Sequence, residues 1–446
     1  MTDATSFDSL WTNATVWLPG GPAEADIGVT QGRVAAILPR GRGTAAEVHD
    51  CTGLTILPGL IDTQVHFREP GLEHKEDLES GSRAAVLGGV TALFEMPNTK
   101  PLTDTAEALA DKLARAKGRI WTDHAFYMGA TADNADHMAE LERLPGCCGV
   151  KIFMGASTGD LLVADDQNLL RVLRSGTRRV AIHAEDEPRM QARLSLRVAG
   201  DPASHPVWRD DESAFLATRR AIAAARDAKR RVHILHVTTP QELAFLAAHK
   251  DIASVEVTPQ HLTLAGEEAY PRLGTHAQMN PPIRSGAHRD GLWHWLGQGV
   301  VDVVGSDHAP HTLEEKARTY PDTPSGMPGV QTIVPLMLNH VAEGRLTLAR
   351  LVDLMASGPQ RLFGLVAKGR IAAGYDADFT IVDLKARWTI ERDWLASRCG
   401  WSPFEGMALT GRPVGTILRG RIAMWENRLA DAPFGVPLRF DETLRA

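Results

Sequence analysis

Six side chains that can bind a metal or move a proton lie at or near the ends of short apolar runs in this sequence. Imidazole nitrogens and carboxylate oxygens are common zinc ligands, and a zinc site that keeps one position open activates water for hydrolysis. The residue types therefore favour a metal-dependent hydrolase. The six are Gln64, His66, Lys151, His183, His236 and Asp307.

Gln64 and His66 are two residues apart in the stretch Asp62–Gly71. If this stretch is a strand, both side chains point to the same face. The imidazole of His66 is a good metal ligand. The amide of Gln64 is neutral, its carbonyl oxygen is a weaker zinc ligand, and its NH2 group cannot bind a metal. The pair predicts a metal site at which Gln64 is the weak member.

Lys151 is flanked by Val150 and Ile152, so a strand here would bury its side chain. Burying an unpaired ammonium is costly, so the group must lose its charge, find a partner or be modified. Each remaining candidate also has an ordinary alternative. A single histidine at a strand end is usually a hydrogen-bonded surface residue, and Asp307 could cap a helix. Their joint placement at strand ends favours a shared metal site.

The elements that would position these residues form a regular series of short apolar runs separated by helical segments, such as Thr105–Lys117, Glu212–Lys229 and Pro240–His249. Eight such units predict a (β/α)8 TIM barrel, whose sites lie at the carboxyl ends of the strands. The eight runs are Thr55–Ile61, Val90–Met96, Thr122–Met128, Gly149–Met154, Arg179–Ile182, Val232–Leu235, Ser254–Val257 and Val300–Gly305.

Both ends of the chain are rich in predicted strands. Three short strands precede the barrel, at Thr12–Leu18, Asp26–Thr30 and Arg33–Leu38, and a second β-rich stretch begins after about residue 365. One small β-sandwich built from both termini is the simplest arrangement. The prediction is a composite sandwich from residues 1–57 and 360–446, with the barrel at 58–359.

The composition is that of an ordinary globular enzyme, with 43% hydrophobic and 23% charged residues in 446. A formal charge of −7 argues against a general nucleic-acid binder. No stretch approaches the roughly 18 apolar residues of a membrane span, and the first residues do not resemble a secretory signal. We expect a cytoplasmic protein with buried, reduced thiols. The cysteines are Cys51, Cys147, Cys148 and Cys399.

Several motifs together resemble the dihydroorotases, within the cyclic amidohydrolases of the amidohydrolase superfamily. The resemblance covers nearly the whole chain, including the Gly-Arg-Ile-x-x-Gly-Tyr-Asp-Ala-Asp stretch that begins at Gly369. The other motifs are Pro58-Gly59-Leu60-Ile61-Asp62, His66-Phe67-Arg68-Glu69-Pro70-Gly71, Met96-Pro97-Asn98-Thr99, Asn280-Pro281-Pro282-Ile283-Arg284 and Ser306-Asp307-His308-Ala309-Pro310-His311.

The resemblance implies a zinc centre with one or two Zn2+ ions per chain. Lys151 would be N-carboxylated, and its carbamate would bridge two ions. His183 and His236 would bind one ion, and His66 and Asp307 would help to bind the other.

The resemblance also implies a reaction, the reversible cyclisation of N-carbamoyl-L-aspartate to (S)-dihydroorotate in pyrimidine biosynthesis. Asp307 would act as general base on the attacking water and return a proton to the leaving nitrogen. Arg68 and Asn98 would bind the substrate carboxylate, with Asn280 and His311 as further contacts. The family suggests a homo-oligomer, such as a dimer.

Gln64 departs from the family pattern, in which the first strand supplies two histidines. It leaves three outcomes open: ligation through the amide oxygen, one firm zinc with a partly occupied second position, or a non-catalytic partner of an enzyme such as aspartate transcarbamoylase. Allantoinase-like or hydantoinase-like activity is a further alternative, although Arg68 favours a substrate with a carboxylate. Arg68 could instead pair with Glu69 or Glu73.

The Gly/Pro-rich segment His311–Thr332, too irregular for a helix, could close over the substrate or be an ordinary loop.

Overall fold

Parallel strands form the barrel that the spacing of apolar runs predicts. The computed structural model describes residues 6–157 and 161–443. Eight strands pair in chain order, and the sheet closes where the His66 backbone N–H donates to the His308 carbonyl at 2.7 Å. This confirms the (β/α)8 fold class. The strands are β7 (Leu60–Val65), β8 (Val90–Glu95), β9 (Asp123–Gly129), β10 (Cys147–Phe153), β11 (Val180–His183), β12 (Val232–Ile234), β13 (Ala253–Val257) and β14 (Val303–Val304).

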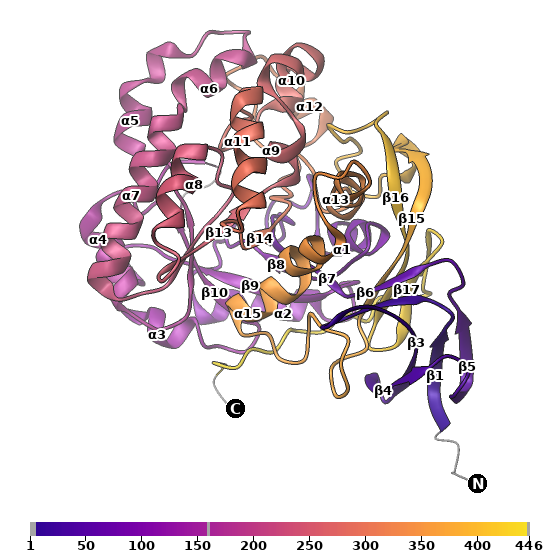
Figure 1. Cartoon of the computed structure of the whole chain (residues 1–446). Helices are drawn as coiled ribbons and strands as arrows, with labels where there is room; N and C mark the ends of the chain where they lie inside the picture. The colour runs from indigo at the N-terminus through magenta and orange to yellow at the C-terminus, as the bar shows by residue number, and fades with distance from the viewer. Residues whose placement is uncertain (1–5, 158–160, 444–446) are drawn as a thin grey trace.

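Helices surround the barrel (Figure 1). Most of the longer ones begin at a residue whose side chain caps the first turn. Thr105, Asp210 and Thr239 cap the three helices predicted above in this way, because their oxygens accept from otherwise unpaired backbone N–H groups. The helices are α1 (Leu78–Leu87), α2 (Ala106–Ala116), α3 (Met138–Leu141), α4 (Asp166–Arg174), α5 (Glu187–Ala192), α6 (His205–Trp208), α7 (Asp211–Ala228), α8 (Pro240–Ala247), α9 (Pro259–Thr263), α10 (Gly266–Leu273), α11 (Gly286–Gly297), α12 (Leu313–Lys316), α13 (Ile333–Ala342), α14 (Leu348–Val352) and α15 (Gly358–Phe363).

The first predicted barrel strand, Thr55–Ile61, is wrong in one respect, because it is two strands in two different sheets. β6 (Thr55–Pro58) pairs with strands from the chain termini, and β7 begins the barrel after Gly59. A Cβ atom on Gly59 would lie 2.5 Å from Thr91 Oγ1 and 2.8 Å from Asp378 Cβ. Glycine therefore lets the chain pass directly from one sheet to the other.

The two chain termini share one ten-stranded sheet, in which strands from both ends lie side by side (Figure 1). Trp11 packs on Phe379 and Trp425, with ring centroids 6.0 and 6.2 Å apart, so both termini share one apolar core. The predicted strand Thr12–Leu18 is in fact two strands, separated at Asn13, which has a φ of 63°. The strands are β1 (Ser6–Thr12), β2 (Thr15–Leu18), β3 (Gly21–Thr30), β4 (Arg33–Pro39), β5 (Thr44–Asp50), β6, β15 (Phe379–Thr389), β16 (Ala408–Leu418), β17 (Arg421–Trp425) and β18 (Arg428–Leu429).

A buried group of charges joins the terminal sheet to the barrel. Lys368 Nζ pairs with Asp123 of β9 and Asp378, and lies 3.1 Å from Asp376. Arg419 also binds Asp123. The four cysteines are buried and free, as expected. None of the helices in the described residues has the length and apolar character of a membrane span. The exact domain boundaries stay a prediction.

Candidate metal centre

The carboxyl ends of the barrel strands bring all six candidate metal-site residues to one cavity. Its volume is about 20 Å3, room for about one water molecule, so the side chains lie close together. Lys151 comes from within β10, and the other five come from strand ends or the residues that follow them. The lining residues are Gln64, His66, Lys151, Phe153, Ser157, His183, His236, Asn280, Asp307, Ala309, Ser325 and Gly326.

Three of the predicted site residues have left-handed backbone. The φ angles are 66° at Arg68, 37° at His236 and 45° at Asp307. Such angles are uncommon outside glycine and cost on the order of 1–3 kcal/mol each. They persist only where the surrounding structure fixes them, and they are concentrated at functional sites.

Lys151 is fully buried, and its Nζ makes no hydrogen bond to any described residue. The Nζ atom lies 4.3 Å from the centre of the Phe153 ring. Burial lowers the pKa of Lys151 to about 7. Burial also lowers the pKa values of His66, His183 and His236, and the charge of Lys151 lowers each of them further. The amine therefore lies near all three imidazoles and is readily available in its neutral, nucleophilic form.

His66 and Asp307 form the first pair of facing donor atoms. His66 Nδ1 lies 2.7 Å from Asn98 Oδ1, which only accepts, so Nδ1 carries the proton. Burial lowers the pKa of His66 to about 4, and Nε2 therefore keeps its lone pair at neutral pH. This Nε2 lies 3.2 Å from Asp307 Oδ1. Two acceptors at this distance repel each other unless a cation binds both.

His183 and His236 form the second pair. His183 Nε2 lies 2.8 Å from Glu185 Oε2, and Arg209 binds both oxygens of that carboxylate. The carboxylate accepts the Nε2–H, which leaves the lone pair on His183 Nδ1. That atom lies 3.0 Å from His236 Nε2. The Glu185–Arg209 pair thus holds His183 in the tautomer that a metal ligand needs.

Gln64 points its two amide atoms in different directions. Its Nε2 donates to Asp307 Oδ1 at 2.9 Å, whereas its Oε1 is buried and has no partner among residues 6–157 and 161–443. The reverse orientation would place the amide oxygen against the carboxylate. The oxygen, the one amide atom able to bind a metal, is therefore the atom left unsatisfied.

This donor set fits metal ions, although no three His, Cys, Asp or Glu side chains converge as a complete metal site in the described part of the chain. The reason is that the donors come as two pairs, with Lys151 and Gln64 as the remaining polar side chains. Unsatisfied buried atoms are costly. Three of them, on Lys151, Gln64 and His236, lie on the wall of this one cavity.

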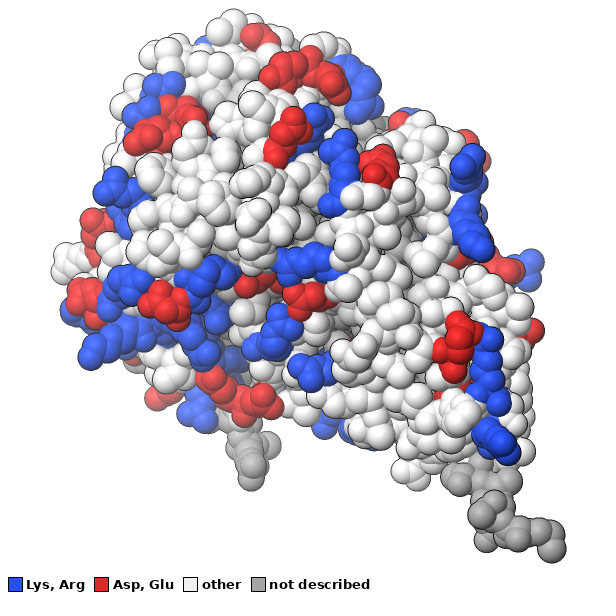
Figure 2. Space-filling model, viewed as in Figure 1, with Lys and Arg blue, Asp and Glu red and all other residues white. Residues whose placement is uncertain are grey.

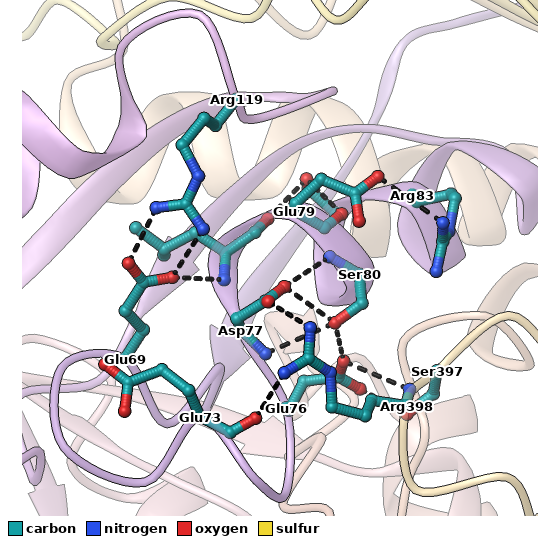
Figure 3. Close-up of polar contacts among 12 residues, drawn as sticks. Glu69, Glu73, Glu76, Asp77, Glu79, Ser80, Arg83, Arg119, Ser397 and Arg398 are labelled. Carbon is teal, nitrogen blue, oxygen red and sulfur yellow. Dashed lines mark hydrogen bonds and ion pairs between the residues drawn. The ribbon is translucent and has the colours of Figure 1, made fainter.

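Arg68 is buried beside the centre and binds neutral groups. Its Nε donates to the Pro310 carbonyl at 3.2 Å, and its Nη2 lies 3.4 Å from His311 Nε2. The alternative of an ion pair with Glu69 or Glu73 is wrong, because Glu69 binds Arg119 at 2.7 Å instead (Figure 3). Burial lowers the pKa of Arg68 to about 10, so it is charged at neutral pH.

The loop that carries Arg68 is held in place from the C-terminal part of the chain (Figure 3). Arg398 Nη1 donates to the Glu73 carbonyl at 2.6 Å, and its Nη2 pairs with Asp77. The Ser397 hydroxyl donates to Glu76. Trp401 Nε1 donates to the His311 carbonyl at 2.8 Å. Residues 397–401 therefore support both the loop that follows Arg68 and the backbone of His311.

The remaining predicted substrate contacts are also anchored. Asn280 Oδ1 lies 2.9 Å from His205 Nε2, and Asn98 binds His66 as described above. His311 lies 3.1 Å from Lys75 Nζ and 3.0 Å from the Ser325 carbonyl. Asn280 lines the cavity, whereas Arg68, Asn98 and His311 lie outside its lining.

The segment His311–Thr332 contains one short helix, α12, contrary to the expectation of no helix. Thr312 and Glu315 form a capping box that starts it, a signal present in the sequence. Lys316 Nζ then donates to the carbonyls of Pro324 and Gly326 at 3.0 and 3.2 Å. These contacts fix Ser325 and Gly326 against the cavity.

Sequence reasoning did not assign Glu185, Arg209 or His205, although each orients a site residue. Glu185 could have been found from its place two residues beyond His183, on the same side of an extended strand. Arg209 and His205 carry no local signal, because their partners are distant in the sequence.

The family model described as "Amidohydrolase family" matches residues 55–423. A dihydroorotase from Halobacterium salinarum is 39% identical, covering 84% of this chain and 88% of its own. An allantoinase from Rubrobacter xylanophilus is 35% identical, covering 96% and 97%. The solved L-hydantoinase (dihydropyrimidinase) from Arthrobacter aurescens has a TM-score of 0.92 and 30% identity, covering 97% and 99%. With these matches around a site of this chemistry, the chain belongs to the amidohydrolase family.

Proposed function

We propose that this protein is a zinc-dependent dihydroorotase, which interconverts N-carbamoyl-L-aspartate and (S)-dihydroorotate in de novo pyrimidine biosynthesis. The observation that carries the proposal is the buried guanidinium of Arg68, which has no carboxylate within ion-pair distance among the described residues. A buried guanidinium without an ion-pair partner is costly, and a substrate carboxylate would supply that partner through two parallel hydrogen bonds. The dihydroorotase relatives support this substrate, whereas the rings of allantoin and hydantoin lack the carboxylate.

The metal cofactor that the family implies would be zinc, held on the two donor pairs. The neutral Lys151 amine would attack CO2 and release one proton, which gives an anionic carbamate that can bind metal ions. His183 and His236 would hold one ion, and His66 and Asp307 the other, with Gln64 Oε1 as a weak further ligand. Zinc supplies Lewis acidity, which polarises the ring carbonyl and favours ionisation of water.

Asp307 would move the proton during hydrolysis. Its carboxylate would take a proton from the attacking water as the oxygen bonds to the ring carbonyl carbon. It would return that proton to the ring nitrogen when the C–N bond breaks. Gln64 Nε2, 2.9 Å from Asp307 Oδ1, holds the carboxylate in orientation. Arg68 would fix the substrate by its carboxylate, which places the amide over Asp307.

Arg68→Met tests the substrate class. We expect kcat/KM for dihydroorotate to fall by about a hundredfold to ten-thousandfold, the loss of two charge-assisted hydrogen bonds. Turnover of an uncharged analogue such as dihydrouracil should change by no more than a few-fold. Arg83→Met, which removes an arginine paired with Glu79 away from the cavity, is the matched control. An equal loss for both substrates would contradict the carboxylate role.

Zinc content and activity measured together test the proposed function and the role of Gln64. Purified protein should contain zinc and hydrolyse dihydroorotate, and Gln64→His should raise zinc toward about two ions per chain, because imidazole is the stronger ligand. Zinc near zero without turnover in either protein would contradict the enzyme. Turnover of allantoin or a hydantoin, but not of dihydroorotate, would reassign the substrate.

A non-catalytic partner of an enzyme such as aspartate transcarbamoylase is the weaker alternative. A chain without catalysis would have no reason to keep Asp307 and Arg68 buried beside the paired donors. We also propose a cytoplasmic homo-oligomer, in keeping with the dihydroorotase resemblance, and sedimentation of the purified protein tests the oligomer.

A further inference from the structure

The opposite end of the barrel contains a second cavity, lined by four arginines. Its volume is about 200 Å3. Arg178 and Arg179 immediately precede β11, Arg231 immediately precedes β12, and Arg361 belongs to α15. Figure 2 shows Lys and Arg side chains on this side of the molecule, around the end of α7 and α15, with Asp and Glu between them.

Arg179 makes hydrogen bonds to neutral oxygens only. Its Nε donates to the Leu362 carbonyl at 3.4 Å, and its Nη1 donates to the Val232 carbonyl at 2.9 Å and the Ser254 hydroxyl at 3.1 Å. Its Nη2 donates to no described residue. Arg178, which is buried, likewise donates to backbone carbonyls, including that of Cys147 at 2.7 Å. Neither guanidinium has an ion-pair partner among the described residues, and that of Arg178 lies 4.6 Å from the centre of the Phe440 ring.

Arg231 is exposed and has no carboxylate partner in the described part of the chain. Arg179 and Arg231 line the same cavity, and burial, followed by the charge of Arg231, lowers the pKa of Arg179 to about 10. Two arginines that do not line the cavity, in contrast, form ion pairs with carboxylates. Arg226 pairs with Asp251 at 3.0 Å, and Arg174 pairs with Asp227 at 3.3 Å. Within the cavity lining, Arg361 pairs with Asp353 at 2.8 Å, whereas Arg178, Arg179 and Arg231 have no such partner in the described part of the chain.

Two carboxylates also line the cavity without neutralising these arginines. Glu442 accepts from Thr177 Oγ1 at 3.1 Å, and Asp441 lies beside Gly364. Neither lies within ion-pair distance of Arg178, Arg179 or Arg231 among the described contacts. They can accept hydrogen bonds from the hydroxyl groups of a protonated phosphate or a phosphate ester.

We propose that this cavity binds a phosphate group. Planar guanidinium groups donate paired hydrogen bonds that match phosphate oxygens, and here Arg179 and Arg231 have no ion-pair partner in the described part of the chain. The cavity is smaller than the roughly 300–1,000 Å3 of sites that enclose a drug-sized ligand. The phosphate is therefore enclosed, and the remainder of any larger molecule lies outside. The site is separate from the metal centre, and the proposal does not depend on the proposed reaction.

Calorimetric titration of the zinc-loaded protein tests the site, with orthophosphate and a nucleoside monophosphate as separate probes. We expect binding of at least one probe, and a loss of affinity of about tenfold or more in Arg179→Met and in Arg231→Glu. Arg231 is exposed, so its replacement leaves the fold intact. Arg226→Ala, outside the cavity, should leave the affinity unchanged. Equal affinities for the two probes would show that the phosphate group alone is recognised. Tighter binding of the nucleotide would show that its nucleoside part also contacts the protein, outside the cavity.

Two results would overturn the proposal. One is the absence of binding by either probe. The other is binding that survives Arg179→Met and Arg231→Glu but is lost in Arg68→Met, which would place the anion at the metal centre.

Discussion

Lys151→Met is expected to give a folded protein that has lost zinc and turnover together. Hydrolysis of dihydroorotate should fall by roughly a thousandfold or more, because metal-ion catalysis contributes several kcal/mol of transition-state stabilisation. The metal-free variant should unfold at a temperature no lower than the metal-free wild type. The wild-type amine makes no hydrogen bond to a described residue, so an apolar chain of similar length removes only the cost of its burial. Zinc analysis, calorimetry and an activity assay provide the three measurements.

Lys316→Met is the matched control, because Lys316 is equally buried and burial lowers its pKa to about 7 as well. Its Nζ, however, donates to backbone carbonyls of the loop over the site, such as Pro324 at 3.0 Å. Its replacement leaves those carbonyls unsatisfied and should lower the unfolding temperature while zinc is retained. Full retention of zinc and activity in Lys151→Met would refute the carbamate assignment.

Asp307→Asn is expected to lower kcat by about a hundredfold to ten-thousandfold, the usual contribution of a positioned general acid–base group. The asparagine oxygen can still accept from Gln64 Nε2, so the fold and the backbone at this position should persist. KM should change by only a few-fold, because the proposed contact of Arg68 with the substrate carboxylate does not involve Asp307. Steady-state kinetics with zinc analysis on the same samples give the measurement.

Asp302→Asn serves as control for Asp307, since Asp302 pairs with Lys250 just before β14, at the opposite end of that strand. This variant should keep kcat. If the activity of Asp307→Asn falls only in proportion to its zinc content, the carboxylate acts as a ligand alone. That result would contradict its role in proton transfer.

Much of the centre could be predicted from the sequence because the decisive signals are local. A ligand-type residue directly after an apolar run, as at His183 or His236, is placed at the mouth of a parallel barrel by the chain direction alone. Lys151 follows the same logic, since two apolar neighbours in a strand dictate burial of the central side chain. The shared β-domain of the two termini could be predicted for a similar reason, because both ends of the chain are rich in strands and need a common core.

Other features depend on contacts between distant residues and leave no local pattern. The interpretation of Arg68 depends on whether Glu69 forms an ion pair with another residue. It does so with Arg119, which lies 50 positions from Glu69 in the sequence. The tautomer of His183 depends on Arg209, which reaches Glu185 from another segment. The break at Gly59 depends on close packing against Thr91 and Asp378 rather than on any weakness of the apolar run itself.

The contacts of residues 397–401 have a consequence for modularity. Arg398 and Trp401 belong to the C-terminal segment by sequence, yet they hold the Glu73–Asp77 loop and His311 at the mouth of the barrel. A barrel excised at residue 359 would keep every candidate metal ligand and lose the contacts that hold the Glu73–Asp77 loop and His311. A graft of this barrel onto the terminal sheet of a relative would lose the same contacts unless residues 397–401 were included in the graft. The catalytic unit is thus longer than the barrel, and recombination within the family is limited to exchanges that preserve this contact.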